Sequence, residues 1–168
     1  GTGGNAKLNS TGLLALINGA STADPTTRGD LAGIFDPPPV LSISASGGIA
    51  KNEGSNLLSG STFSFTVSRS HANGESTVDY VVNGVVDAFG RHGADAGDFG
   101  SGTVPLLPSG TVTFANGETS KTISISVAGD TVTERDETFS VTLLNPTSAI
   151  LNITSSVQAT ILNDDVAT

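Results

Sequence analysis

The chain has 168 residues and a formal net charge of -9, which comes from 16 acidic against 7 basic residues. This length suits one domain with a sizeable core and some sequence left over for an additional segment. The acidic balance excludes a nucleic-acid-binding protein, because neutralising phosphates requires a basic face. We therefore expect cations, and no nucleic acid, as partners.

The residue types that are absent narrow the class of protein further. With no cysteine, the chain has no disulfides, no thiolate metal site and no thiol nucleophile. No run of residues approaches the roughly 18 apolar residues of a membrane span. Abundant glycine, at 21 residues, with no tryptophan or methionine is typical of turn-rich β-proteins found outside cells. The composition predicts an extracellular or cell-surface protein.

The first 37 residues differ from the rest of the chain. The stretch "STGLLALINGAS" is compatible with one short helix, and a strand through residues 13–17 is an almost equal alternative. The polar stretch that follows and the run "DPPPV" indicate an extended connector. We predict that residues 1–37 form an N-terminal arm or linker and that residues 38–168 form the main domain. Whether the arm docks on its own domain or on a neighbouring copy stays open.

From residue 41 onward, apolar residues recur at every second position, which is the pattern of half-buried strands. Gly, Asn and Pro turns separate these segments, so the pattern predicts an all-β fold with seven short strands in a two-sheet sandwich. The apolar positions of the strands are Leu41 and Ile43; Phe63, Phe65 and Val67; Val78, Tyr80 and Val82; Val112 and Phe114; Ile123, Ile125 and Val127; Phe139, Val141 and Leu143; and Val157, Ala159 and Ile161.

The turn "ANGE" lies between the fourth and fifth of these strands. Asn116-Gly117 readily adopts the positive φ angles of a tight turn. The sequence therefore predicts that the two flanking strands form a hairpin.

Acidic residues gather in the loops at the ends of several predicted strands. Strand ends at one edge of a sandwich lie close together, so acids from four separate segments can converge. They are Asp130, Glu134, Asp136 and Glu137 in "GDTVTERDETF", Glu53 in "KNEG", Asp95 and Asp98 in "DAGDFG", and Asp164 and Asp165 in "ILNDD".

Seven of these carboxylates form a candidate metal site, and they would repel one another without a cation. Two unit charges 4 Å apart interact by about 1 kcal/mol in water and about 4 kcal/mol at an effective dielectric constant of 20. Calcium accepts about 6 to 8 oxygen ligands, whereas magnesium demands stricter octahedral geometry. On spacing alone, a solvated acidic loop without an ion is an equal alternative. The seven residues are Glu53, Asp98, Asp130, Glu134, Glu137, Asp164 and Asp165.

The order of these motifs closely resembles that of the Calx-beta domain family. The resemblance covers residues 39–165 and rests on "AGDF", on "GTVTFANGETSKTISISVAGDTVTERDETFSVTLLNP" and on the terminal "ATILNDD". Members are calcium-binding sandwiches of sodium/calcium exchangers, of integrin β4 and of large bacterial surface proteins. The resemblance implies a seven-stranded immunoglobulin-like β-sandwich of Calx-beta type in which the seven carboxylates hold calcium. It also implies that Asp136 faces solvent.

The chain departs from the family pattern at three points. Calcium-sensing members often carry a run of aspartates, whereas Gly129 precedes and Thr131 follows Asp130 here, and Asn163 precedes Asp164. Fewer charges imply fewer or weaker sites, so one or two ions are expected rather than four. The connection over residues 84–109 is also longer than usual in the family, which makes Asp98 the least certain ligand.

A catalytic role is not expected. Ser70, Asp87 and Asp95 could be combined with His71 or His92 into a triad, but nothing in their spacing imposes the necessary geometry. A glycosidase or a carbohydrate-binding module would require aromatic platforms, and the chain has one tyrosine and no tryptophan. We therefore expect that the protein is not an enzyme.

The sequence leads to one functional prediction with two alternatives. It predicts a calcium-stabilised extracellular structural subunit that assembles with identical subunits into a surface filament through its N-terminal arm, as a donor strand adds to an open sheet edge. The first alternative is a single repeat of a large bacterial adhesin with an unknown adhesion ligand. The second is a regulatory calcium-sensing domain.

Overall fold

The structure is a computed structural model, and it describes residues 37–55, 60–86, 93–100 and 106–166. The chain divides into two units, Gly1–Pro37 and Pro38–Thr168. Apart from Pro37, the first unit lies outside the described residues. The prediction of an arm and the choice between a helix and a strand in residues 13–17 are therefore not tested.

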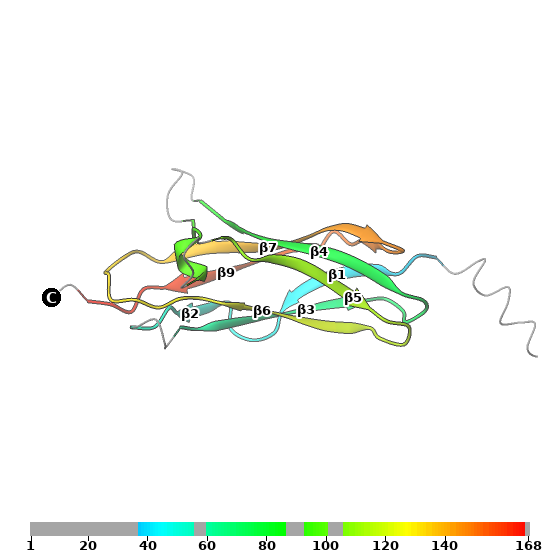
Figure 1. Cartoon of the computed structure of the whole chain (residues 1–168), viewed down its shortest axis with the longest axis horizontal. Helices are drawn as coiled ribbons and strands as arrows, with labels where there is room; N and C mark the ends of the chain where they lie inside the picture. The colour runs from blue at the N-terminus through cyan, green and yellow to red at the C-terminus, as the bar shows by residue number, and fades with distance from the viewer. Residues whose placement is uncertain (1–36, 56–59, 87–92, 101–105, 167–168) are drawn as a thin grey trace, which may run out of the picture. The chain divides into compact units, whose positions relative to one another are not determined.

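The second unit contains two β-sheets that pack face to face (Figure 1). The first sheet has the strand order β6-β3-β1-β8, and β3 pairs antiparallel with both β6 and β1, while β1 and β8 are parallel. Its strands are β1 (Val40–Ala45), β3 (Thr62–Arg69), β6 (Ser120–Ser126) and β8 (Ile150–Leu151).

The second sheet has the strand order β2-β9-β7-β4-β5. Its central strands are antiparallel, and the short β2 joins the edge of β9 in parallel. Its strands are β2 (Ala50–Asn52), β4 (Ser76–Gly84), β5 (Ser109–Phe114), β7 (Glu137–Thr147) and β9 (Ser156–Leu162). A short 3-10 helix, η1 (Gly97–Phe99), lies between β4 and β5 in the sequence.

The predicted all-β sandwich is confirmed, and all seven predicted strands are present. The described residues contain two further short strands, β2 and β8. The predicted hairpin is wrong, because β5 pairs with β4 in one sheet while β6 pairs with β3 in the other. The predicted tight turn is present, since Gly117 adopts a positive φ of 95°. The turn therefore connects the two sheets, and the apolar side chains of β5 and β6 are buried in the core between them.

The apolar sides of both sheets meet in one core around Phe139. The Phe139 ring makes edge-to-face contacts with Phe63 and Phe99, at centroid distances of 5.1 and 5.2 Å. Burying such rings is strongly favourable, and their edge-to-face arrangement adds about 0.5–1.5 kcal/mol per pair. Phe63 comes from the first sheet and Phe99 from η1, so this ring cluster fixes η1 to the sandwich.

The chain enters and leaves the sandwich unit at opposite ends. Val40 begins β1 beside Ser70, which follows the end of β3. The last strand, β9, ends at Leu162, whose carbonyl accepts the Glu53 N–H beside the start of β3. Within the described ranges, no helix has the length and apolar character needed to cross a lipid bilayer.

Candidate metal site

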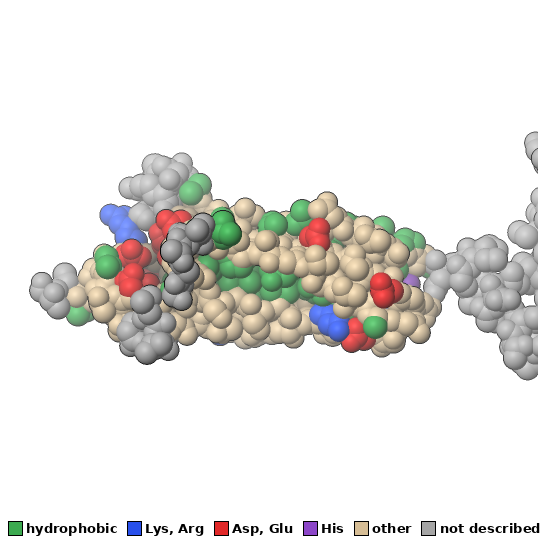
Figure 2. Space-filling model, viewed as in Figure 1, with side chains coloured by type: hydrophobic (Ala, Val, Ile, Leu, Met, Phe, Trp, Pro, Cys, Tyr) green, Lys and Arg blue, Asp and Glu red, His purple; other side chains and the backbone are tan. Residues whose placement is uncertain are grey.

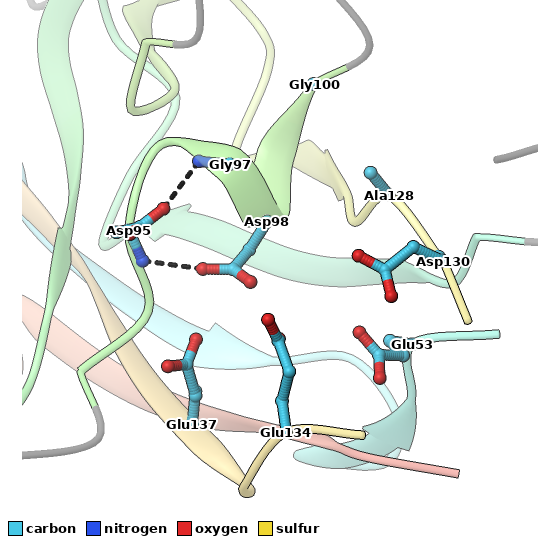
Figure 3. A pocket seen from close by; sticks show the side chains of 10 residues that line it. Glu53, Asp95, Gly97, Asp98, Gly100, Ala128, Asp130, Glu134 and Glu137 are labelled. Carbon is cyan, nitrogen blue, oxygen red and sulfur yellow. Dashed lines mark hydrogen bonds between the residues drawn. The ribbon is translucent and has the colours of Figure 1, made fainter. Parts of the chain in front are cut away.

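Six carboxylates line one cavity at the end of the sandwich where the chain leaves it (Figures 2 and 3). The cavity has a volume of about 180 Å³, which is room for a cation with several waters. Figure 3 shows the carboxylates facing the same space from above and below. We call this site the acidic pocket, and its carboxylates are Glu53, Asp95, Asp98, Asp130, Glu134 and Glu137.

Glu53 is held at the junction between the two sheets. Its N–H donates to Leu162 O in β9 (3.0 Å), and its carbonyl accepts from Ser61 N (3.2 Å), next to β3. The residue is only 4% exposed, and its Oε1 is buried with no hydrogen-bond partner. A buried carboxylate oxygen without a partner is costly, so this site needs a proton or a cation.

The segment that contains η1 brings Asp95 and Asp98 to the pocket. Asp98 Oδ2 accepts from Asp95 N (2.6 Å), and Asp95 Oδ1 accepts from Gly97 N (2.6 Å). Ala128 N donates to Asp98 O (2.7 Å), which ties this turn to the end of β6. In each aspartate one oxygen holds the turn, and the Asp98 carboxyl also shares a hydrogen bond with the Glu137 carboxyl.

The connection from β6 to β7 supplies the remaining three carboxylates. Asp130 Oδ1 accepts from Val132 N (2.6 Å), a local turn that fixes the start of the connection. Glu137 is the first residue of β7, and Glu134 lies three positions before it. The pocket therefore joins side chains from loops of both sheets.

Mutual repulsion and burial keep several pocket carboxyls from ionising in the usual range. Burial, reinforced by Asp130 and Glu134, raises the pKa of Glu53 to about 7. Burial, together with Asp98 nearby, raises the pKa of Glu137 to about 8. Burial also raises the pKa of Glu134 and of Asp98. Ionising all of these carboxyls together at neutral pH is therefore unfavourable without a compensating positive charge.

Two of the seven predicted ligands, Asp164 and Asp165, do not line the acidic pocket. Asp164 accepts from Gly54 N (3.1 Å) and Asn52 Nδ2 (3.4 Å), which fastens the end of β2. Asp165 has a buried Oδ2 without a partner. Both carboxylates raise the pKa of Glu53, so they lie close enough to Glu53 to repel its charge.

The structure adds one pocket residue that sequence reasoning left out of the ligand set. Asp95 lines the cavity beside Asp98. The signal was present in "DAGDFG", where both aspartates flank the turn. Asp136, expected to face solvent, is exposed, and its Oδ1 accepts from Asn163 N (3.2 Å).

The residues fit a hard cation, although they do not yet converge on one point. In the described part of the chain, no three acidic or histidine side chains already lie in position to hold one metal ion. Uncompensated like charges drive carboxylates apart, and an ion would draw them together. The buried, unpaired Oε1 of Glu53 and the all-oxygen lining match the donors that calcium takes.

The suggested triad residues do not assemble within the described residues. Ser70 and His71 contact each other (3.0 Å) at the end of β3 away from the acidic pocket. Asp95 lies in the acidic pocket at the other end. Asp87 and His92 lie outside the described residues.

Residues 97–166 match the family model of the Calx-beta domain. The resemblance noted in the sequence is thereby confirmed over these residues. The comparison with curated proteins finds no match.

Solved structures share the fold across a larger part of the chain. The apo-form Calx CBD1 domain is 22% identical with a TM-score of 0.56, over 74% of this chain and 98% of that one. The calcium binding domain CBD12 of CALX1.1 is 25% identical with a TM-score of 0.57, over 75% of this chain and 47% of that one. The chain thus spans about half the length of the CBD12 structure.

Proposed function

Because residues 97–166 match the Calx-beta domain family, we propose that this sandwich is a calcium-binding module whose ion ties together the loops at one end of the two sheets. Glu53, Asp98, Asp130, Glu134 and Glu137 would hold the ion, with Asp95 beside them. Calcium would supply positive charge that compensates the clustered carboxylates.

The buried carboxylate of Glu53 is the observation that carries this proposal. Its Oε1 has no partner, and its neighbours in the cavity are other carboxylates rather than Lys or Arg. A structural role for water alone would leave the repulsion between these groups in place. A cation removes the repulsion and satisfies the unpaired oxygen at once.

The chemistry of the lining favours calcium over other metals. All candidate donors are carboxylate oxygens, and the chain contains no cysteine. Carboxylates from several separate segments suit the variable coordination of calcium better than the strict octahedron of magnesium. Zinc would favour nitrogen and sulfur donors instead.

The role of the ion is structural, and the module works outside the cell. Extracellular calcium modules bind at about 10⁻⁴ to 10⁻³ M, where calcium is always present. The entry and exit of the chain at opposite ends of the sandwich also suit a module linked in series with others. Such an arrangement accommodates both a filament subunit and a repeat of an adhesin. The same proposal includes no catalytic activity, and the described residues that line the acidic pocket contain no serine, threonine, lysine or histidine side chain.

Calorimetric titration with calcium and, separately, with magnesium tests the binding. We expect calcium to bind with a dissociation constant of about 10⁻⁴ to 10⁻³ M and magnesium to bind more weakly. A thermal melt in calcium and in EDTA provides a second readout. If calcium releases no heat and leaves the melting temperature unchanged, the proposal fails.

The same titration separates the structural role from the regulatory alternative. A sensor binds at about 10⁻⁷ to 10⁻⁵ M and changes conformation on binding. Saturation below about 10⁻⁵ M would therefore overturn the structural role while leaving calcium binding intact.

Assembly through the N-terminal arm is the second part of the proposal. The sheet edge at β6 offers unpaired backbone to an added strand. Deleting residues 1–37 should abolish filaments seen by negative-stain electron microscopy. An adhesin repeat would instead be monomeric with and without these residues.

A further inference from the structure

The edge of β5 differs from the other sheet edges of the sandwich. Among the described residues, the two sheets end in β6, β8, β2 and β5. The strands β8 and β2 are only 2 and 3 residues long. Lys121 lies in β6, and its ammonium group is tied to Glu118 (2.7 Å). A short edge strand, or one that carries a charged residue, pairs poorly with a strand from another molecule, and β5 is neither short nor charged.

The residues of β5 make it well suited to strand pairing. Its sequence, SGTVTF, has no charged residue and no proline. Thr111, Val112 and Thr113 are β-branched, which favours extended backbone. The charge-free edge stands out in a chain with a net charge of -9.

The hydrogen-bond register shows which backbone groups are free. Val82 N donates to Pro108 O (2.8 Å), and the same register pairs Tyr80 with Gly110 and Val78 with Val112. Even-numbered residues of β5 therefore direct their N–H and C=O groups toward β4. The groups of Ser109, Thr111 and Thr113 point away from β4, where no described strand pairs with them. We call these three residues the β5 edge.

We propose that the β5 edge binds the same edge of a second copy of this chain, in antiparallel pairing about a two-fold axis at Thr111. This register places Ser109 opposite Thr113 of the second copy, and Thr111 opposite its own equivalent. All free groups of both edges are then satisfied in about six backbone hydrogen bonds. The two five-stranded sheets become one continuous sheet.

The lack of charge on the β5 edge favours a second copy as the occupant, because two identical edges can meet without repulsion. All three side chains of the edge are exposed hydroxyl residues, and cross-strand pairs of such residues are favourable. The nearest fixed charge is Asp79 on β4, which accepts from Thr111 Oγ1 (2.7 Å). In the paired sheet the two Asp79 side chains are three strand spacings, about 14 Å, apart. This exceeds the Debye length of about 8 Å at physiological salt, so their repulsion is screened.

The association is weak and independent of the calcium proposal. A single pair of edges buries less than the roughly 1,200 Å² of a standard interface, so we expect a dissociation constant of about 10⁻⁴ M. No β5 residue lines the acidic pocket. Loss of calcium binding would therefore leave this interface in place.

Sedimentation equilibrium from 20 μM to about 1 mM tests the proposal on the chain without residues 1–37, which removes assembly through the arm and keeps the compact sandwich unit. The double variant Ser109→Lys/Thr113→Lys places like charges opposite each other across the two-fold axis. The matched control Thr122→Lys/Ser124→Lys makes the same change in charge on the free edge of β6. All four positions are exposed, so both variants should keep the circular dichroism spectrum and melting temperature of the wild type.

We expect the wild type and the β6 control to approach twice the monomer mass, and the β5 variant to stay monomeric. Amide resonances of Ser109, Thr111 and Thr113 should shift with concentration in the wild type. A monomer at every concentration would overturn the proposal. Dimerisation that survives in the β5 variant, or that is lost in the β6 control, would overturn it too.

Discussion

Replacing Glu53 with glutamine should stabilise the protein without calcium and weaken its stabilisation by calcium. Without metal, the substitution removes a buried charge from a cluster of like charges. With calcium, it removes a ligand. The side chain keeps nearly the same shape, so changes in packing contribute little.

The structure indicates how much Glu53→Gln should change the free energy of unfolding in the absence of metal. Burial and the neighbouring carboxylates raise the pKa of Glu53 from 4.5 to about 7. Each unit is worth about 1.4 kcal/mol, so ionised Glu53 costs at most about 3 kcal/mol at pH 8. Solvent in the cavity reduces this cost. We expect Glu53→Gln to raise the free energy of unfolding in EDTA by about 1–2 kcal/mol, or the melting temperature by about 3–8 °C.

Calcium should largely cancel this advantage. With a dissociation constant of about 10⁻⁴ M, 5 mM calcium stabilises the wild type by about 2 kcal/mol. Losing a carboxylate ligand should weaken binding by about 10- to 100-fold, so calcium stabilises the variant by about 1 kcal/mol or less. The assay is thermal unfolding followed by circular dichroism at pH 8, in EDTA and in 5 mM calcium.

Glu75→Gln is the matched control, because it removes the same charge from an exposed loop residue outside the pocket. Its response to calcium should equal that of the wild type. The reasoning is refuted if Glu53→Gln destabilises the protein in EDTA, since Glu53 would then not be strained. It is also refuted if calcium stabilises Glu53→Gln as much as the wild type.

Three further predictions concern pH and backbone packing. In the folded protein the pKa of Glu53 is raised to about 7 and that of Glu137 to about 8. Without metal, the stability that these two carboxyls contribute is fully present below their unfolded pKa of 4.5 and is lost as the pH rises through 7 to 8. Urea unfolding in EDTA at pH 5 and pH 8 should show this decline, and a flat profile would contradict it. Gly60→Ala should cost more than about 3 kcal/mol in urea unfolding, because its Cβ would lie 1.9 Å from Val127 O. Gly48→Ala, whose Cβ would meet only a backbone oxygen at 3.6 Å, is its control and should cost less than about 1 kcal/mol; equal losses would disprove the clash. Arg69→Met should lower the free energy of unfolding by about 3–5 kcal/mol in the same assay. The reason is that the buried guanidinium donates to the carbonyls of Ala72 and Ala115 (2.9 and 2.7 Å), among others. A loss below about 1 kcal/mol would show that water replaces these bonds.

The sequence determined the strands, because alternation of apolar residues is a local signal. Phe63, Phe65 and Val67 are all buried, as their spacing requires. The short β2 and β8 have no such pattern, since they are too short to show a period and form only by pairing with longer neighbours. Most of the carboxylates also lie in loops as predicted, because acids next to strand ends are visible in sequence, while Glu137 is the first residue of β7.

Only the tertiary structure decided which strands and which carboxylates meet. Local periodicity carries no information on partners across the fold, so the Asn116-Gly117 turn was taken for a hairpin when it crosses between sheets. The burial of Glu53 depends on backbone bonds to β9 and to the start of β3, which are distant in sequence. Asp95 lines the pocket, whereas Asp164 accepts from Gly54 N beside β2, and neither outcome is visible in the sequence because it depends on segments that only the fold brings together.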